Sequence, residues 1–243
     1  NQLSYPWSPE DRDIQKNRDN HYGFINYASA LAADRVFFNS EFHMNSFLDA
    51  LHPFLKHFPD HNELDSVNII RNKSSVLHLG MDLKRFDSYK ALKEGKPLIL
   101  WNHRWEYDKN PELFFSVLEK VKNNSYDFSL VVLGENFSQS PVVFDHAKNI
   151  FKDEIVQWGY TGSFDEYAEW LWKVDILPVT SNQEFFGASV MEAIYCNTWP
   201  ILPARLTYPE LIPKKSHKKH LYVDESDLYE KFIWAIQNYK RIR

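Results

Sequence analysis

The chain has 243 residues, of which 44% are hydrophobic and 25% charged, and its formal net charge is −5. This length holds one large domain or two small ones, and the acidic balance gives no global signature of nucleic-acid binding. No apolar stretch reaches the length of a membrane span. The single cysteine, Cys196, excludes an intrachain disulfide framework and fits a reducing compartment, so we expect a cytoplasmic protein. The sequence does not indicate an oligomeric state.

The first 88 residues predict a few short elements and a linker. Apolar residues at helical spacing predict a helix that follows a polar turn within residues 8–33, and a strand at 35–40 comes next. Ser40 can cap a helix over 41–51, and Pro53 and Pro59 are expected to break the following stretch. Residues 76–80 read as a short apolar strand closed by glycine, and residues 82–96 as a polar interdomain linker.

From Pro97 onward, apolar strands alternate with helices. We expect strands at 98–101, 128–134, 155–159, 175–179 and 199–202, and helices at 111–122, 144–151, 164–173, 187–195 and 227–239. Strands that are apolar throughout and separated by helices predict a parallel sheet covered on both faces, an α/β fold. Ligands of such sheets lie outside the carboxyl ends of the strands. The polar residues that follow these strands are therefore the candidates for a site.

The first polar island, residues 103–111, contains His103, Arg104 and Lys109 and directly follows a predicted strand. A guanidinium can fork onto two phosphate oxygens, and an ammonium adds a mobile point charge. Together they suit a diphosphate and can stabilise the charge that builds on it as it departs. The alternative is a surface loop in which Arg104 pairs with a neighbouring carboxylate, Glu106 or Asp108.

The second island places two carboxylates, Glu184 and Glu192, on either side of Phe186 and of a predicted helix start at Gly187, Ala188 and Ser189. The amides of the helix start predict an anion site, because the first turn leaves them unpaired and the helix dipole favours negative charge. Glu192 is placed to accept both hydroxyls of a ribose, and Glu184 to reach a transferred sugar. The alternative is that Glu184 caps the helix and Glu192 is a solvated surface residue.

Weaker candidates also end predicted strands. Gly134, Gly159 and Tyr160 could shape a base and ribose pocket through backbone contacts, although a plain turn accounts for each equally well. The run Lys214–His220 is basic; most such runs are solvated loops, but this one is the only indication of RNA in the sequence.

The cations of the first polar island and the amides and carboxylates of the second together predict the binding of a nucleotide diphosphate-sugar.

These motifs resemble the retaining glycosyltransferases of the GT-B fold, in particular family 4. That family pairs an Arg and a Lys after the first strand of the C-terminal domain with two Glu that have seven residues between them, and both occur here in order. More closely, four segments resemble the tRNA-queuosine alpha-mannosyltransferases: residues 1–6, 103–109, 158–160 and 184–187. Asn197 stands where the family has glycine, a position at which Asn tolerates the left-handed conformation.

The resemblance implies a GT-B enzyme with a Rossmann-like parallel-sheet donor domain at residues 89–243. Residues 1–88 would be the remnant of a truncated, Rossmann-like N-terminal acceptor domain with the linker, and this fragment alone is expected to be inactive. The implied donor is GDP-mannose and the implied acceptor is queuosine in a tRNA anticodon, with no cofactor and no metal. Arg104 and Lys109 would hold the diphosphate, Glu184 the mannose and Glu192 the ribose.

Two other functions remain open at this point. One is a GT-B glycosyltransferase that uses another nucleotide-sugar and a lipid, a polysaccharide or a small molecule as acceptor. The other is a non-catalytic nucleotide-sugar-binding protein, against which the complete set of Arg104, Lys109, Glu184 and Glu192 argues.

Overall fold

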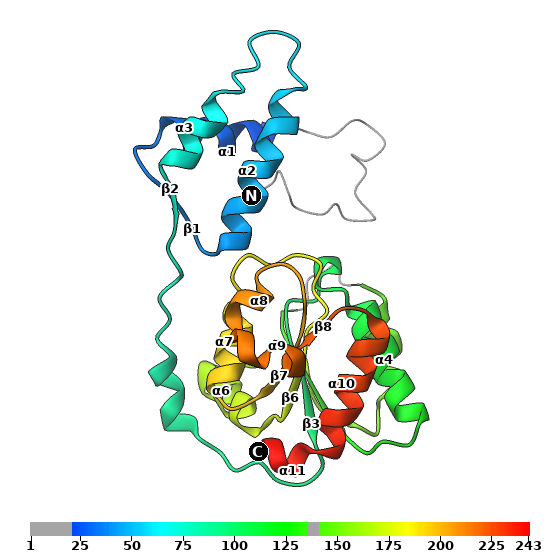
Figure 1. The fold of residues 1–243 in the computed structure, drawn as a ribbon. Helices are drawn as coiled ribbons and strands as arrows, with labels where there is room; N and C mark the ends of the chain where they lie inside the picture. Colours follow the sequence, from blue (N-terminus) through cyan, green and yellow to red (C-terminus); the bar gives the residue numbers. More distant parts are fainter. Residues whose placement is uncertain (1–20, 136–140) are drawn as a thin grey trace. The chain divides into compact units, whose positions relative to one another are not determined.

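A computed structural model describes residues 21–135 and 141–243, and these residues form two compact units (Figure 1). The first unit comprises the chain up to Gly80 together with Gln183–Phe186. The second comprises Met81–Asn182 and Gly187–Arg243. The motif expected at residues 1–6 lies outside the described residues.

The first unit is a small helical layer beside a two-stranded parallel sheet. Its elements are α1 (His21–Ala32), β1 (Val36–Phe38), α2 (Glu41–Leu55), α3 (Ser66–Asn72) and β2 (Ser74–Val76). Ser40 caps α2 by accepting a hydrogen bond from the amide of His43, as the sequence predicts. Its core is formed by apolar side chains of both sheet and helices: Tyr27, Phe38, Phe47, Leu48, Leu51, Phe54 and Ile70.

Two expectations for this unit need correction, and one of its helices was not predicted. Helix α2 continues past Pro53 to Leu55, because a proline this close to a helix end removes only one intrahelical hydrogen bond. The second strand lies at Ser74–Val76 rather than at residues 76–80, since its pairing with Val36–Phe38 sets the register. Helix α3 was not predicted: it spans only seven residues, too few for a clear apolar period.

The second unit contains a six-stranded, fully parallel sheet in the order β5-β4-β3-β6-β7-β8. Its strands are β3 (Leu98–Asn102), β4 (Ser129–Leu133), β5 (Ile155–Trp158), β6 (Ile176–Pro178), β7 (Trp199–Pro203) and β8 (Leu221–Tyr222). The chain starts at central β3, builds outward to β5, then returns to β6 on the other side. This reversal between β3 and β6 is the topological switch point, where open α/β sheets bind their ligands.

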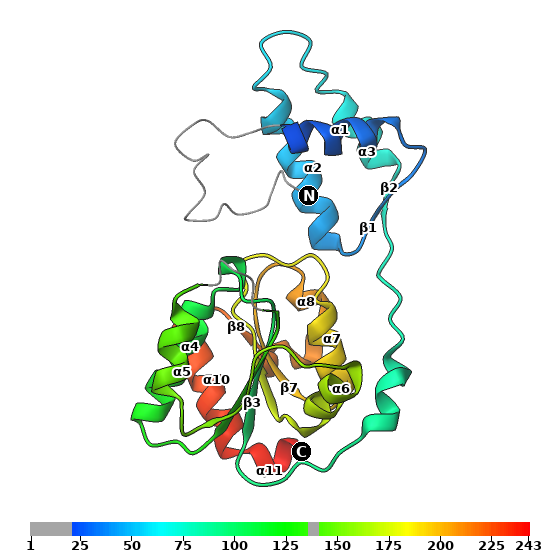
Figure 2. The ribbon, with the colours of Figure 1, turned by 180° about the vertical axis from the view of Figure 1, so that it is seen from behind.

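Helices cover both faces of this sheet, as the apolar strands predict. Helices α4 (Pro111–Asn123), α5 (Val143–Ile150) and α10 (Glu225–Gln237) lie on one side, and α6 (Phe164–Lys173), α7 (Ala188–Tyr195) and α8 (Tyr208–Leu211) on the other (Figures 1 and 2). Figure 2 shows the same three layers from behind. The first face buries an aromatic cluster in which Trp105 stacks on Phe144 at 4.3 Å between ring centroids. Aromatic residues make up 16% of the chain, and they therefore serve the core in large part.

Two segments of the second unit differ from the prediction. Residues expected to form a polar linker contain the 3-10 helix η2 (Leu83–Tyr89), which docks because Phe86 is fully buried against α6. Between β7 and α10 the chain forms α8, η4 (Lys214–Ser216), α9 (His217–His220) and the edge strand β8, none of which was predicted. Helix α10 begins at Glu225 rather than Asp227, because Asp224 caps it by accepting from the amide of Asp227.

Candidate functional site

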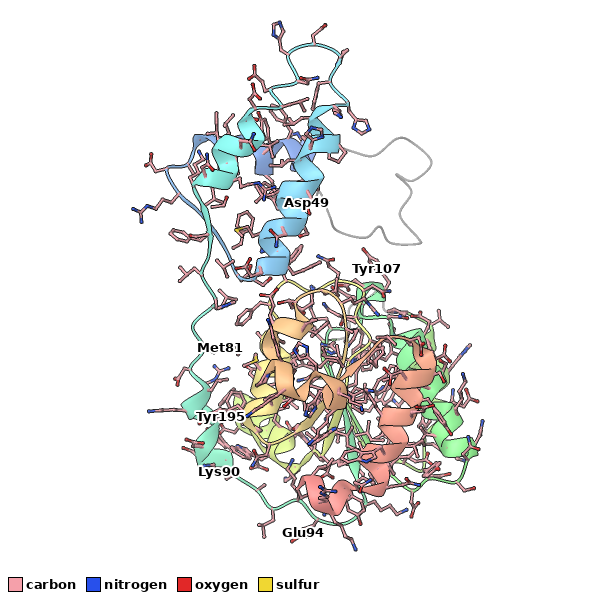
Figure 3. The ribbon with its side chains drawn as sticks, viewed as in Figure 1. Asp49, Met81, Lys90, Glu94, Tyr107 and Tyr195 are labelled. Atoms are coloured by element: carbon pink, nitrogen blue, oxygen red, sulfur yellow. The ribbon has the colours of Figure 1, made fainter. Side chains whose placement is uncertain are left out.

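Polar side chains gather in the second unit at the carboxyl ends of β3, β4 and β5. A cavity of about 280 Å³ opens there, lined by Asn102, Leu133, Gly134, Tyr160, Thr161, Ser163, Phe164 and Tyr167. Figure 3 labels Tyr107, just after β3, and Glu94, just before it, and they lie at opposite ends of this unit. The cavity lies at the end near Tyr107, beside the switch point, where a ligand is expected.

Gly134 is required by a close approach of two backbone segments. A Cβ placed on Gly134 would lie 2.0 Å from the carbonyl oxygen of His103, and its φ of +119° is a conformation that L side chains rarely adopt. The amide of Trp105 also donates to the carbonyl of Glu135, so the end of β4 fixes the loop that follows β3. Gly159, with φ +106°, has open space around it and serves the turn after β5. Backbone contacts thus fix the wall of the cavity at Gly134.

His103 is a buried, neutral group at the edge of this site. It is 4% exposed, and burial, followed by the charge of Lys109, lowers its pKa to about 3. Its Nδ1 lies 3.5 Å from the hydroxyl of Ser189, whereas its Nε2 has no hydrogen-bond partner among the described residues. A neutral imidazole can donate one hydrogen bond to an anion but brings no charge at neutral pH.

Lys109 ends the short 3-10 helix η3 (Tyr107–Lys109), which the loop after β6 holds in place. The hydroxyl of Thr180 donates to the carbonyls of Lys109 and Asn110, and the amide of Asn182 donates to the carbonyl of Asp108 at 2.7 Å. The Lys109 ammonium lies 3.2 Å from the carboxylate of Asp108, and both side chains are almost fully buried. Two sides of the switch point therefore fix this cation together.

Arg104, unlike Lys109, lies on the surface in an exposed ion pair. Its guanidinium pairs with Glu106 at 2.9 Å and its side chain is 53% exposed, which is the surface pairing raised as the alternative. Such exposed pairs contribute roughly 0–1 kcal/mol, so Arg104 can exchange Glu106 for a better anion at little cost. Burial raises the pKa of Glu106 despite the opposing effect of Arg104.

Helix α7 presents its first turn to the end of β3. Gly187 takes the left-handed conformation, φ 86°, and precedes Ala188, the first helical residue. The side-chain amide of Asn102 donates to the carbonyl of Ser189 at 3.0 Å, which ties the helix start to the cavity wall. Within the described part of the chain, no acceptor bonds the amides of Gly187, Ala188 and Ser189. These amides can receive an anionic oxygen.

Glu192, on the second turn of α7, is held by two side chains. Arg85 of η2 donates to its Oε1 at 3.1 Å, and the hydroxyl of Tyr167 donates to its Oε2 at 2.8 Å. The Glu192 side chain is only 14% exposed, so it is not the solvated surface residue of the alternative. Burial and then Glu192 raise the pKa of Tyr167 well above its usual value, so this phenol stays protonated and keeps donating.

Glu184 belongs to the segment Gln183–Phe186, which groups with the first unit. Its Oε1 accepts hydrogen bonds from the amides of Phe185 and Phe186, at 3.0 and 3.2 Å. The carboxylate thus fixes the turn that carries it, which is close to the capping role considered as the alternative.

The second unit therefore brings together, at one end of its sheet, most of the residues singled out in the sequence. Sequence reasoning missed three further side chains here: Asn102, Tyr167 and Arg85. Asn102 is the last residue of a strand and could have been found by the strand-end rule. Tyr167 and Arg85 lie 25 and 107 residues from Glu192 and carried no local signal.

Comparison with known proteins defines the class of this chain. The family model described as glycosyl transferases group 1 matches residues 84–242, and the chain belongs to this family. Residues 1–81 match a second model, described as the N-terminal part of tRNA-queuosine alpha-mannosyltransferase. The tRNA-queuosine alpha-mannosyltransferase of Drosophila melanogaster is 36% identical over 225 residues, 89% of this chain and 58% of its own length. The resemblance stated from the motifs is thereby confirmed, and the chain spans little more than half of this relative.

Solved structures confirm the GT-B type of fold. Sucrose-phosphate synthase from Thermosynechococcus elongatus superposes with a TM-score of 0.71 at 16% identity, over 99% of this chain and 57% of that one. HepE from Anabaena, solved with UDP-glucose, gives 0.67 at 13% identity, over 94% and 61%. The C-terminal domain of LpcC from Francisella tularensis gives 0.54 at 18% identity, over 67% and 91%. Among the described helices, none combines the length and the apolar character of a membrane span.

Asn197, which follows α7, has φ 61°, the left-handed conformation that the sequence predicts for it.

Proposed function

We propose that the whole protein transfers mannose from GDP-mannose to the queuosine base of a tRNA anticodon, with retention at the anomeric carbon. The observation that carries the acceptor and the sugar is the match of residues 1–81 to the N-terminal part of tRNA-queuosine alpha-mannosyltransferase. Membership of the glycosyl transferases group 1 supports a nucleotide-sugar donor.

In this proposal the nucleoside of the donor occupies the cavity at the ends of β3, β4 and β5. Its volume, about 280 Å³, is near the lower limit of ligand pockets, ~300 Å³. The backbone at Gly134 and Gly159 and the exposed ring of Tyr160 border the base. Glu192, oriented by Arg85 and Tyr167, accepts the ribose hydroxyls.

The diphosphate takes the amides of Gly187, Ala188 and Ser189, with His103 as a neutral donor beside them. Lys109 supplies a fixed charge, and Arg104 leaves Glu106 to fork onto phosphate oxygens. No metal enters the proposal, because these two cations neutralise the departing GDP. Loss of one such donor typically costs about 3–4 kcal/mol of transition-state stabilisation.

The chemical step breaks the bond between the anomeric carbon and the phosphate oxygen and forms a bond to the acceptor hydroxyl on the same face. The acceptor proton passes to an oxygen of the departing diphosphate, so no protein nucleophile is needed. Glu184 binds hydroxyls of the mannose and Phe186 borders it. The catalytic set is thus Arg104, Lys109 and Glu184.

The test is titration of GDP, UDP and ADP into this chain by calorimetry, with Glu192→Ala and the exposed Glu169→Ala as a matched control. We expect selective GDP binding that Glu192→Ala abolishes and Glu169→Ala leaves intact. A preference for UDP or ADP would retain a glycosyltransferase but refute GDP-mannose. Absence of any binding would refute a complete donor site in this chain.

A further inference from the structure

A second hollow, of about 460 Å³, lies outside the donor cavity, between α9 and α10. It is lined by Lys218, Lys219, Asp227, Glu230, Lys231 and Trp234, none of which lines the donor cavity. Helix α9 leads into the edge strand β8, whereas the donor cavity belongs to β3, β4 and β5 on the other side of the switch point. We call this second site the lysine–tryptophan hollow.

The lysine–tryptophan hollow adjoins uncompensated positive charge. Lys214, Lys215, Lys218 and Lys219 are all exposed, and none forms an ion pair with any residue that the structure describes. The chain as a whole carries a net charge of −5, so this cluster is a local feature. Neighbouring ammonium groups without counterions attract a ligand that carries more than one negative charge.

An exposed indole forms part of the wall. Trp234 is 41% exposed although it packs on Trp199, with 5.3 Å between ring centroids. Trp199 in turn contacts His220 at 4.3 Å, and Nδ1 of His220 bonds the carbonyl of Pro200. These tilted ring contacts support Trp234 on one side. A supported indole beside lysines is how single-stranded nucleic acid is bound, by base stacking and phosphate contact.

The carboxylates of the hollow favour a nucleotide over an acidic peptide. Asp227 is occupied, because it accepts from Lys231 at 2.5 Å and from the amide of Val223 at 3.0 Å. Glu230 is exposed and forms no ion pair within the described part of the chain. Its carboxylate repels phosphates and acidic side chains alike, but only a nucleotide also brings the amino or imino edge of a base, from which the carboxylate can accept a hydrogen bond.

We propose that the lysine–tryptophan hollow binds an unpaired nucleotide of an RNA strand, with its base on Trp234 and its flanking phosphates at Lys218 and Lys219. The identity of this RNA as the acceptor tRNA rests on the proposed function. The hollow holds the RNA at a point separate from the donor cavity, so it contributes to affinity and not to the chemical step.

Fluorescence anisotropy with a labelled single-stranded RNA and a tRNA, at several salt concentrations, tests this site. The variant Lys218→Ala/Lys219→Ala is compared with Lys148→Ala/Lys152→Ala, which removes equal charge from exposed lysines of another surface. We expect the first pair alone to weaken binding and to reduce the salt slope by about 1.4, from ~0.7 for each of two phosphates. Trp234→Ala should weaken binding about tenfold and Trp234→Phe much less, because phenylalanine still stacks.

Other outcomes overturn the proposal. These are no RNA binding by the wild type, equal losses in both lysine pairs, or equal competition by poly-glutamate of the same charge. The last would indicate a general polyanion surface. GDP titration of the same variants checks folding independently of RNA, since the donor cavity shares no residue with the hollow. In the wild type, intact GDP binding without RNA binding would refute the hollow and leave the proposed donor site standing, whereas in the Lys218→Ala/Lys219→Ala variant the same pattern is the expected result.

Discussion

The contact between Arg85 and Glu192 predicts a measurable coupling between the segment η2 and the donor site. In Arg85→Gln the ion pair to Glu192 is lost, and so is the cation–π contact in which the guanidinium lies 4.3 Å above the ring of Phe164. The Arg85 side chain is 49% exposed and that of Glu192 14%, so the pair is intermediate between a surface pair and a buried one. We estimate a loss of about 1–2 kcal/mol of unfolding free energy from the two contacts together.

A double-mutant cycle isolates the pair. Urea unfolding of Arg85→Gln, Glu192→Gln and the double variant should give a coupling energy of about 1 kcal/mol, which rises at low salt. Calorimetry should show weaker GDP binding in Arg85→Gln, because Glu192 then keeps only Tyr167 to orient it. Arg85→Lys should recover part of the stability and less of the affinity. A coupling energy below about 0.3 kcal/mol would refute the reasoning, since sites that do not interact already deviate from additivity by about that much.

Three further predictions follow from the second unit. Gly134→Ala should weaken GDP binding and unfold more readily than Gly159→Ala by about 1–2 kcal/mol. Both residues have positive φ but only Gly134 meets a carbonyl, so equal effects in urea unfolding would exclude that close approach as the cause. The folded state keeps His103 neutral down to about pH 3. The contribution of His103 to the free energy of unfolding is therefore complete above pH 6.5. As the pH drops below 6.5, this contribution decreases by up to about 1.4 kcal/mol for each pH unit, because the unfolded chain binds a proton that the folded state does not. From pH 7.5 to 5.5 the wild type should therefore lose about 1.4 kcal/mol of unfolding free energy relative to His103→Gln, and a constant difference would contradict the lowered pKa. Arg243→Ala removes both guanidinium bonds to the fully buried Asp175 and should cost about 3 kcal/mol. Urea unfolding should find part of this restored in Arg243→Ala/Asp175→Asn, and no restoration would mean that the buried charge is not the cause.

The parallel sheet and its helices were predictable because each element carries its own period. Helix α6 was predicted at its observed bounds, since Ser163 caps it and apolar residues recur at helical spacing. The segment from Tyr208 to Tyr222 was not predictable in this way. Its prolines, Pro209 and Pro213, and its lysines interrupt any period, and β8 is only two residues long.

The candidate site was predictable where it follows strand ends and not where it depends on distant partners. The strand-end rule located the loop after β3 and the start of α7. The local sequence also raised the pairing of Arg104 with Glu106 as the alternative, and the structure shows it. It gave no sign that Arg85 lies against Glu192, because that contact is set only when the chain has folded. Local sequence therefore indicates where a charge is, and tertiary structure decides which partner it meets.

The reversal at β3 has a consequence for how this unit assembles. Strands β3, β4 and β5 come from one continuous stretch of chain and β6, β7 and β8 from the next. Within the sheet the two stretches meet at the seam where β3 pairs with β6, and α10 of the second stretch also packs on α4 of the first. The cavity is built mainly by the first stretch, while the amides of α7 and Glu192 come from the second. A nucleotide bound across the seam would tie the halves together, so it should promote reassembly if they were made as two separate peptides.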